Sequence, residues 1–114
     1  MLETILGNRN AYLCLIYLYH YGEAYPNMIA KALGEKTMTP IKAQLRRLEE
    51  GGVLKGRKVG QTTMYSFNER SSIVKLLREM VKIEYENIPA KDKEKLFKIR
   101  SRTRREGKPV INEN

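Results

Sequence analysis

The chain has 114 residues and a net charge of +9 at pH 7, and it is 41% hydrophobic and 31% charged. This length predicts one domain with a core of its own, and the composition argues against both a disordered chain and a membrane protein. The longest apolar run, Ala11 to Tyr19, is about half the length needed to cross a bilayer and predicts a buried helix. No secretory signal is recognisable, so we expect a cytoplasmic protein.

Cysteine and histidine each occur once, as Cys14 and His20. These counts exclude an intrachain disulfide and a zinc site built from Cys and His of one chain. The two residues are six positions apart on one predicted helix, which places them on opposite faces and argues against a catalytic pair. With no phosphate-binding glycine loop and no set of metal ligands, we expect neither an enzyme nor a cofactor.

The positive charge is concentrated at the two ends of the chain. Residues 1–68 carry 9 basic and 5 acidic side chains, and residues 91–114 carry 9 and 4. Such an excess points to a polyanionic partner, and we favour nucleic acid over an anionic membrane because no basic, aromatic-anchored amphipathic helix is evident. An ordinary basic surface without a partner would give the same total charge.

The first predicted helix runs from Asn10 to Tyr21 and ends at Gly22. It is apolar on nearly every side, although a helix that faces one small core needs only an apolar stripe. We therefore expect the additional apolar face to contact a partner molecule.

Two shorter helices are expected next. Pro26 occupies a typical first helical position, and the segment that follows it ends at Gly34. A polar turn over Glu35 to Met38 leads to a third helix, for which Thr39 is the expected N-cap residue, and this helix continues to about Glu50.

The periodicity then changes from helical to alternating between Val53 and Phe67, which predicts a β-hairpin with a basic, glycine-containing tip over residues 57–62. A long helix is expected to begin at Asn68 or Ser71. Its apolar residues cover a wider arc than one core can accept, so it is a second candidate for a dimer contact.

A last, basic helical segment lies between Pro89 and Gly107, and the end of the chain, Val110 to Asn114, is expected to fray. The role of this segment stays open between an additional phosphate contact and a solvated helix. The predicted organisation is a core over residues 1–69, a dimerisation helix over 70–88, and a basic C-terminal helical segment and tail over 89–114.

Two adjoining stretches, TMTPIKAQLRRLEEGGVL and GRKVGQTTMYSFNE, resemble the recognition helix and the wing of winged helix-turn-helix regulators of the ArsR and MarR type. The resemblance covers about Tyr12 to Glu69. It implies a mainly α fold with a small β-hairpin wing, here with additional C-terminal helices, that binds double-stranded DNA as a homodimer and regulates transcription. The paired cysteines and the His and carboxylate ligands of metal-sensing relatives are missing, so a metal sensor is not expected.

Helical spacing separates the recognition helix into two sides. Ile41, Leu45 and Leu48 share one side and should be buried, which turns the polar residues outward. Arginine can bind guanine edges, threonine can bind bases or phosphates, and alanine can approach a thymine methyl group. The predicted DNA-binding residues are Thr39, Lys42, Ala43, Arg46 and Arg47 on this helix, and Arg57, Lys58, Gln61 and Thr62 on the wing.

Dimerisation is expected to use the first predicted helix and the long helix together, because both are apolar on more than one side. The predicted interface residues are Tyr12, Leu15, Ile16, Tyr19, Leu77, Met80 and Val81.

Two other functions stay open at this stage. Winged helices also serve as protein-interaction adaptors without DNA binding, and an apolar or acidic outer face on the recognition helix would favour that function. RNA binding is less favoured, because the stacking aromatic residues of sheet-based RNA binders are missing.

Overall fold

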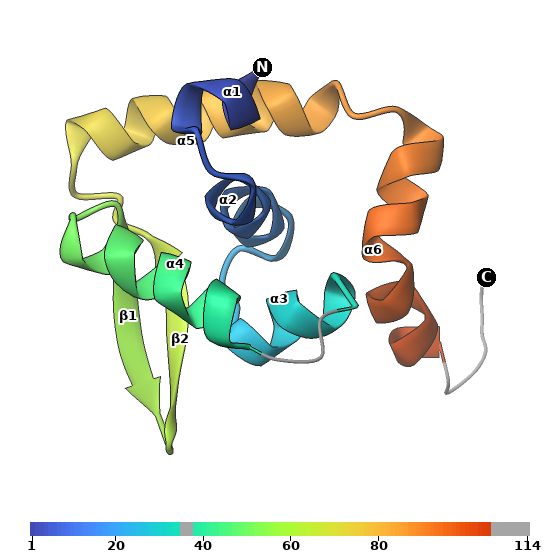
Figure 1. Ribbon diagram of the computed structural model, residues 1–114, viewed down its shortest axis with the longest axis horizontal. Coiled ribbons are helices and arrows are strands. Elements are labelled where there is room, and N and C mark those ends of the chain that lie inside the picture. The colour runs from blue at the N-terminus through green and yellow to red at the C-terminus, as the bar shows by residue number, and fades with distance from the viewer. Residues whose placement is uncertain (35–37, 106–114) are drawn as a thin grey trace.

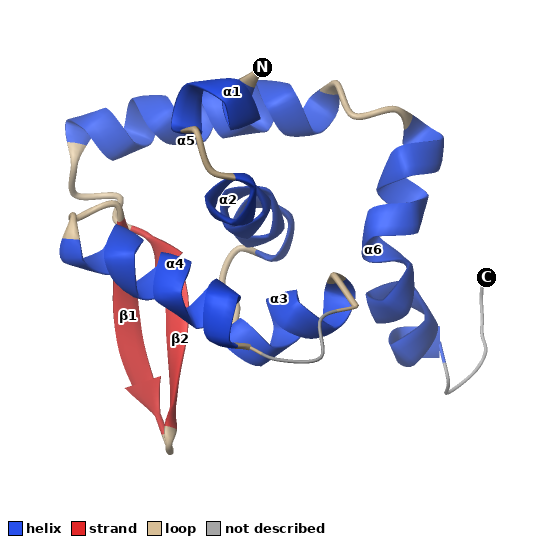
Figure 2. Cartoon of the chain, viewed as in Figure 1, coloured by secondary structure: helices blue, strands red, loops and turns tan. Residues whose placement is uncertain are grey.

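The structure of the chain is a computed structural model that describes residues 1–34 and 38–105, with side chains described up to Phe97. Within these residues, six helices surround or form the core, and a two-stranded hairpin projects from one side (Figures 1 and 2). The elements are α1 (Leu2–Leu6), α2 (Arg9–Tyr21), α3 (Pro26–Ala32), α4 (Thr39–Glu50), β1 (Leu54–Val59), β2 (Thr62–Phe67), α5 (Ser72–Glu86) and α6 (Ala90–Arg105).

The helix α2 is the centre of the fold, and Figure 1 shows it end-on with the other helices around it. It packs against α1, α4, α5 and β2. Its side chains from Leu13 to Leu18 are all buried, five of them with no exposed surface. The apolar sides predicted to need a partner molecule are therefore covered by other elements of the same chain.

Local signals in the sequence set the ends of α2 and α5. The Asn8 side chain accepts a hydrogen bond from the Ala11 amide at 2.9 Å, and Gly22 ends α2 with a φ of 86°. At the start of α5, the Ser71 hydroxyl accepts from the Val74 amide at 3.2 Å. Ser71 was one of the two predicted starting points of this helix.

Several predicted boundaries differ from the structure. Thr39 is the first residue of α4 and Met38 is its N-cap, so the predicted cap was one residue late. The short helix α1 was not predicted at all, because five residues with no clear periodicity give no usable sequence signal. Most of the predicted polar turn, residues 35–37, and the predicted frayed end, Val110 to Asn114, lie outside the described residues.

The hairpin pairs Leu54 with Phe67 at its base and Val59 with Thr62 at its tip. Ala24 forms a bridge to Tyr65, with N–O distances of 3.0 and 2.9 Å, so β2 is paired on both sides at that point. The turn itself consists of Gly60 and Gln61, and Gly60 has a φ of 63°, which favours glycine.

The helix α6 is attached to the rest of the fold by aromatic contacts. Phe97 is 6% exposed, stacks on the His20 ring at 3.8 Å and meets the Tyr17 ring edge-on at 4.9 Å. The Tyr17 hydroxyl donates a hydrogen bond to the carbonyl oxygen of Leu96. These contacts hold α6 beside α2, and α6 also packs against α3.

The burial of Cys14 has a consequence for stability at alkaline pH. Burial raises the pKa of its thiol from 9.0 to about 12. Above pH 9 the unfolded chain therefore binds fewer protons than the folded chain, and the free energy of unfolding falls by about 1.4 kcal/mol per pH unit for this group. A Cys14→Ala variant should show a flatter decline, measured by urea denaturation at several pH values on both sides of 9. Parallel curves for the two proteins would contradict this assignment.

Candidate nucleic-acid interface

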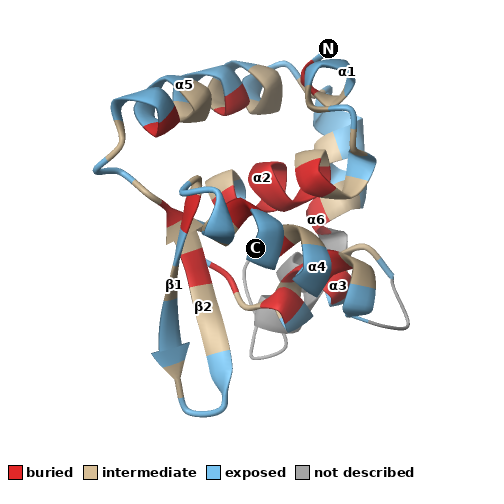
Figure 3. Cartoon of the chain, turned by 60° about the vertical axis from the view of Figure 1, so that its left-hand side comes forward, coloured by how far each residue is buried: buried red, intermediate tan, exposed pale blue. Residues whose placement is uncertain are grey.

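The helix α4 has one buried side and one exposed side, as its sequence spacing predicts. Ile41 and Leu45 have no exposed surface and Leu48 is 6% exposed. Figure 3 shows the opposite side of α4 facing solvent. All five residues predicted to bind DNA on this helix are exposed: Thr39, Lys42, Ala43, Arg46 and Arg47. Their exposure is confirmed, and their contact with DNA stays a prediction.

The two arginines of α4 have different surroundings. The Arg47 Nε donates a hydrogen bond to Gln44 Oε1 at 3.0 Å, so its guanidinium is oriented along the helix surface. Arg46 is exposed, and its positive charge acts on Tyr65 of β2. Burial and the Glu49 carboxylate raise the pKa of the Tyr65 hydroxyl, and the charge of Arg46 opposes this rise. Arg46 is thus within electrostatic range of the hairpin.

The basic residues of the wing lie on strand β1 and not in the turn at the tip of the hairpin. Arg57 and Lys58 belong to β1, Thr62 begins β2, and only Gln61 among the predicted wing residues lies in the turn. The predicted tip over residues 57–62 is therefore too long, because the two-residue turn lets pairing continue to Val59 and Thr62. All four predicted wing residues are exposed.

Arg57 forms an ion pair that sequence analysis did not anticipate. Its Nη2 is 3.2 Å from Oε1 of Glu23, which lies in the loop between α2 and α3. The side chains are 61% and 50% exposed. Glu23 and Arg57 are 34 positions apart, and no periodic pattern connects them, so the sequence carries no signal for this pair. The pair places a negative charge beside one of the two wing cations.

Gly56 of β1 lies close to side chains of both α4 and β2. A Cβ atom at Gly56 would lie 2.6 Å from Glu49 Oε2 and 2.9 Å from Thr63 Cγ2, both shorter than real Cβ contacts allow. Only glycine fits here without a shift of its neighbours. Sequence analysis gave Gly56 no role, although a glycine inside a strand is a recognised sign of such an approach.

The predicted dimer residues separate into three groups. Leu15, Ile16 and Val81 have no exposed surface, so the prediction that they contact a partner is wrong: they form the core of one chain. Tyr12, Tyr19 and Leu77 are half-buried against that core. Met80, at 43% exposed, is the one predicted interface residue with a largely free side chain.

A different apolar surface is exposed on α5. Four large hydrophobic side chains follow one another at spacings of three, four and three residues, which places them along one side of the helix. We call this the α5 stripe. Its residues and exposed fractions are Ile73 at 78%, Leu76 at 67%, Met80 at 43% and Ile83 at 58%.

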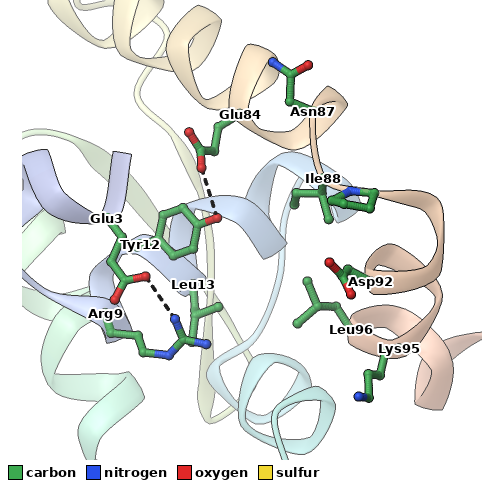
Figure 4. A pocket seen from close by; sticks show the side chains of 11 residues that line it. Glu3, Arg9, Tyr12, Leu13, Glu84, Asn87, Ile88, Asp92, Lys95 and Leu96 are labelled. Atoms are coloured by element: carbon green, nitrogen blue, oxygen red, sulfur yellow. Dashed lines mark hydrogen bonds and ion pairs between the residues drawn. The ribbon is translucent and has the colours of Figure 1, made fainter. Parts of the chain in front are cut away.

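A pocket of about 450 Å³ lies where α1 and α2 meet α5 and α6 (Figure 4). Four of the polar side chains that line it form two pairs: Arg9 pairs with Glu3 at 3.0 Å, and the Tyr12 hydroxyl donates to Glu84 at 3.4 Å. Burial and the nearby Glu84 carboxylate raise the pKa of that hydroxyl. These contacts connect α1 and α2 to α5, and none of the predicted DNA-binding residues lines the pocket.

Within residues 1–34 and 38–105, no three or more His, Cys, Asp and Glu side chains come together in a way that could hold a metal ion. No helix in this part of the chain is both long and apolar enough to span a membrane.

Solved structures similar to this chain include the following two, whereas no family model and no curated protein sequence matches it. One is the homodimeric winged helix-turn-helix DNA-binding domain of Mb0332 from Mycobacterium bovis, a possible ArsR-family transcriptional regulator. It is 26% identical over 74% of each chain, with a TM-score of 0.53. The other is reduced AbfR bound to DNA, 18% identical over 89% of this chain and 74% of that chain, with a TM-score of 0.56. The fold is a winged helix-turn-helix with an additional C-terminal helix, in which α3 and α4 form the helix-turn-helix and β1 and β2 form the wing.

Proposed function

We propose that this protein binds double-stranded DNA and regulates transcription, with α4 in the major groove and the hairpin against the neighbouring backbone. The observation that supports this most directly is the position of Arg46. It is exposed on the outer side of the recognition helix and within electrostatic range of the hairpin, which carries two further exposed cations, Arg57 and Lys58.

The chemistry of the outer α4 side suits a DNA groove. Arginine donates two hydrogen bonds to the O6 and N7 atoms of guanine, and threonine donates to or accepts from bases and phosphates. An apolar or acidic outer surface would favour a protein partner. The exposed residues predicted to bind DNA form neither kind of surface. The DNA-binding neighbours Mb0332 and AbfR are consistent with the same use of the fold here.

We further propose that two copies associate through the α5 stripe. Four large hydrophobic side chains exposed along one helix side would leave water if the same side of a second copy lay against them. A twofold axis makes such a surface complementary to itself and presents two recognition helices to successive major grooves, about 34 Å apart. The homodimeric state of the Mb0332 domain supports a dimer here.

Substitutions on the outer side of α4 should change sequence preference. Removing a guanine contact by Arg46→Ala should cost about 1–3 kcal/mol at the preferred site and less on scrambled DNA. The preferred site is first selected from random duplexes, and binding is then titrated by fluorescence anisotropy. If Arg46→Ala and Lys42→Ala together leave binding to the selected site intact, α4 is not the DNA-contacting helix and the protein-adaptor function takes precedence.

Changes in the wing should act on all duplexes alike. Lys58→Ala should weaken binding to specific and scrambled DNA by similar factors and reduce the slope of log affinity against log salt by about one unit.

Glu23→Gln should instead strengthen binding to both kinds of DNA. Since an exposed ion pair is worth about 0–1 kcal/mol, releasing Arg57 from it should strengthen binding about two- to fivefold.

The control for this prediction is an Arg57→Gln/Glu23→Gln double variant. If Glu23 acts through Arg57, the gain from Glu23→Gln disappears once Arg57 is absent. An equal gain in both backgrounds would mean that Glu23 acts by general repulsion of DNA.

Interrupting the α5 stripe should separate the dimer. At micromolar concentration, sedimentation equilibrium of the wild type should give twice the chain mass of 13.3 kDa. Leu76→Glu should give a single chain mass, because a buried unpaired carboxylate opposes association. Lys75→Glu introduces the same side chain on the same helix outside the stripe and should leave the dimer intact. A monomeric wild type would contradict the proposed dimer.

A further inference from the structure

A pocket of about 410 Å³ lies where the base of the hairpin meets α2 and α5. Three of the side chains that line it are cations: Lys55 from β1, Arg70 from the segment before α5, and Arg78 from α5 itself. The pocket shares no residue with the one between α1, α2, α5 and α6, and none of the residues predicted to bind DNA lines it. Its cations therefore have no role in the site described above.

The register of the hairpin places this pocket on the side that faces away from α4. A Cβ atom at Gly56 would point at the Glu49 carboxylate of α4. Successive residues of a strand point to opposite sides, so the neighbouring Lys55 points away from α4. Ser66 is the cross-strand partner of Lys55 and lies on the same side, which adds a hydroxyl group to the pocket wall.

Arg78 closes the pocket from α5 and is held in position by an aromatic ring. Its guanidinium carbon lies 5.1 Å from the centre of the Tyr19 ring, a distance at which the cation is attracted to the ring face. At about 100° per residue, Arg78 is on the side of α5 opposite the α5 stripe. A partner molecule that covered the stripe would leave this pocket open.

The charges that line the pocket do not balance. Glu69 is the one carboxylate among the lining residues, so the three cations leave a net charge of +2. Its Oε2 is 3.8 Å from the Arg78 Nε, with side chains 68% and 38% exposed, so this ion pair is weak. Within residues 1–34 and 38–97, neither Lys55 nor Arg70 forms an ion pair. Like charges in one pocket repel one another, and a bound anion would relieve the repulsion.

We propose that this pocket binds the phosphate group of a small phosphate monoester. Such a group carries a charge of about −1.5 to −2 at pH 7, which matches the net charge of the pocket. The guanidinium groups of Arg70 and Arg78 can donate paired hydrogen bonds to phosphate oxygens, and Ser66 can donate one more.

The rest of the ligand has an apolar surface to contact. The pocket is lined by Leu18, which has no exposed surface, and by Phe67, which is 5% exposed, and its volume falls in the usual range for small-molecule sites. An apolar group attached to the phosphate would lie against these side chains. The site therefore favours an organic phosphate over free phosphate.

The test measures the binding of phenyl phosphate to the full chain by isothermal titration calorimetry. An Arg70→Gln/Arg78→Gln variant should bind it about tenfold more weakly, because charge-assisted hydrogen bonds are lost. Lys75→Gln/Lys82→Gln is the matched control, since it removes two charges from α5 outside the pocket and should keep the wild-type affinity. Circular dichroism verifies that each variant is folded, and Lys55→Gln, at an exposed strand position, should also weaken binding.

Two further measurements are specific to the charge of the pocket. Glu69→Gln removes its carboxylate and should strengthen binding about two- to fivefold, a gain that a poorly folded variant would not produce. Benzoate has a similar apolar ring but a single negative charge, and inorganic phosphate has no apolar group. Both should bind the wild type more weakly than phenyl phosphate does.

The outcomes are independent of the proposed function, because none of them requires DNA binding. No binding of phenyl phosphate to the wild type overturns the inference, and so does an equal loss in the pocket variant and the control, which would show an effect of total charge alone. Benzoate bound as tightly as phenyl phosphate would overturn the assignment to phosphate. Finally, if Arg70→Gln/Arg78→Gln weakens duplex DNA binding more than the control does, these cations belong to the DNA interface and the inference is wrong.

Discussion

The enclosure of α2 is the constraint on which the rest of the structure depends. A central helix that is buried on every side from Leu13 to Leu18 must be covered from several directions, and this chain uses α1, α4, α5 and β2 for that purpose, with α6 attached through Tyr17. Each fully buried Leu or Ile contributes about 1.5–3 kcal/mol relative to an exposed one. The positions of α4 and α5 are therefore both set by the same helix, on different sides of it, and this is why the recognition helix and the α5 stripe can point away from each other.

The enclosure of α2 also explains which sequence-based predictions succeeded. Helices with a single apolar stripe, such as α4, were predicted correctly in type and in orientation, because Ile41, Leu45 and Leu48 leave only one side that can be buried. The exposed and buried sides of the recognition helix, and with them five of the candidate DNA-binding residues, followed directly from this spacing. The same argument failed for α2 because an all-apolar helix is equally consistent with a dimer interface and with the centre of a core. Leu15 and Ile16 lie in the centre of the core.

Other features depend on contacts between residues far apart in the chain, and no local pattern predicts them. The Arg57–Glu23 pair needs the loop after α2 and the first strand to meet, which follows from the pairing of Ala24 with Tyr65. The close fit of Gly56 against Glu49 also depends on residues from different elements.

The α5 stripe was not predicted for a different reason. Its residues could be identified as apolar, but the side of α5 that packs on α2, through Val74 and Val81, is known only once α2 is placed.

The distribution of charge over this fold follows from the same arrangement. The exposed basic residues predicted to bind DNA lie on two surfaces, the outer side of α4 and the hairpin. The hairpin and α6 are attached to the core through Tyr65 and Phe97, respectively, each a buried aromatic ring. In the hairpin, the buried Tyr65 ring fixes the base of the element, while Arg57 and Lys58 farther along stay exposed to solvent. Because the strand that carries these two cations is already ordered, binding a polyanion there would require less backbone ordering.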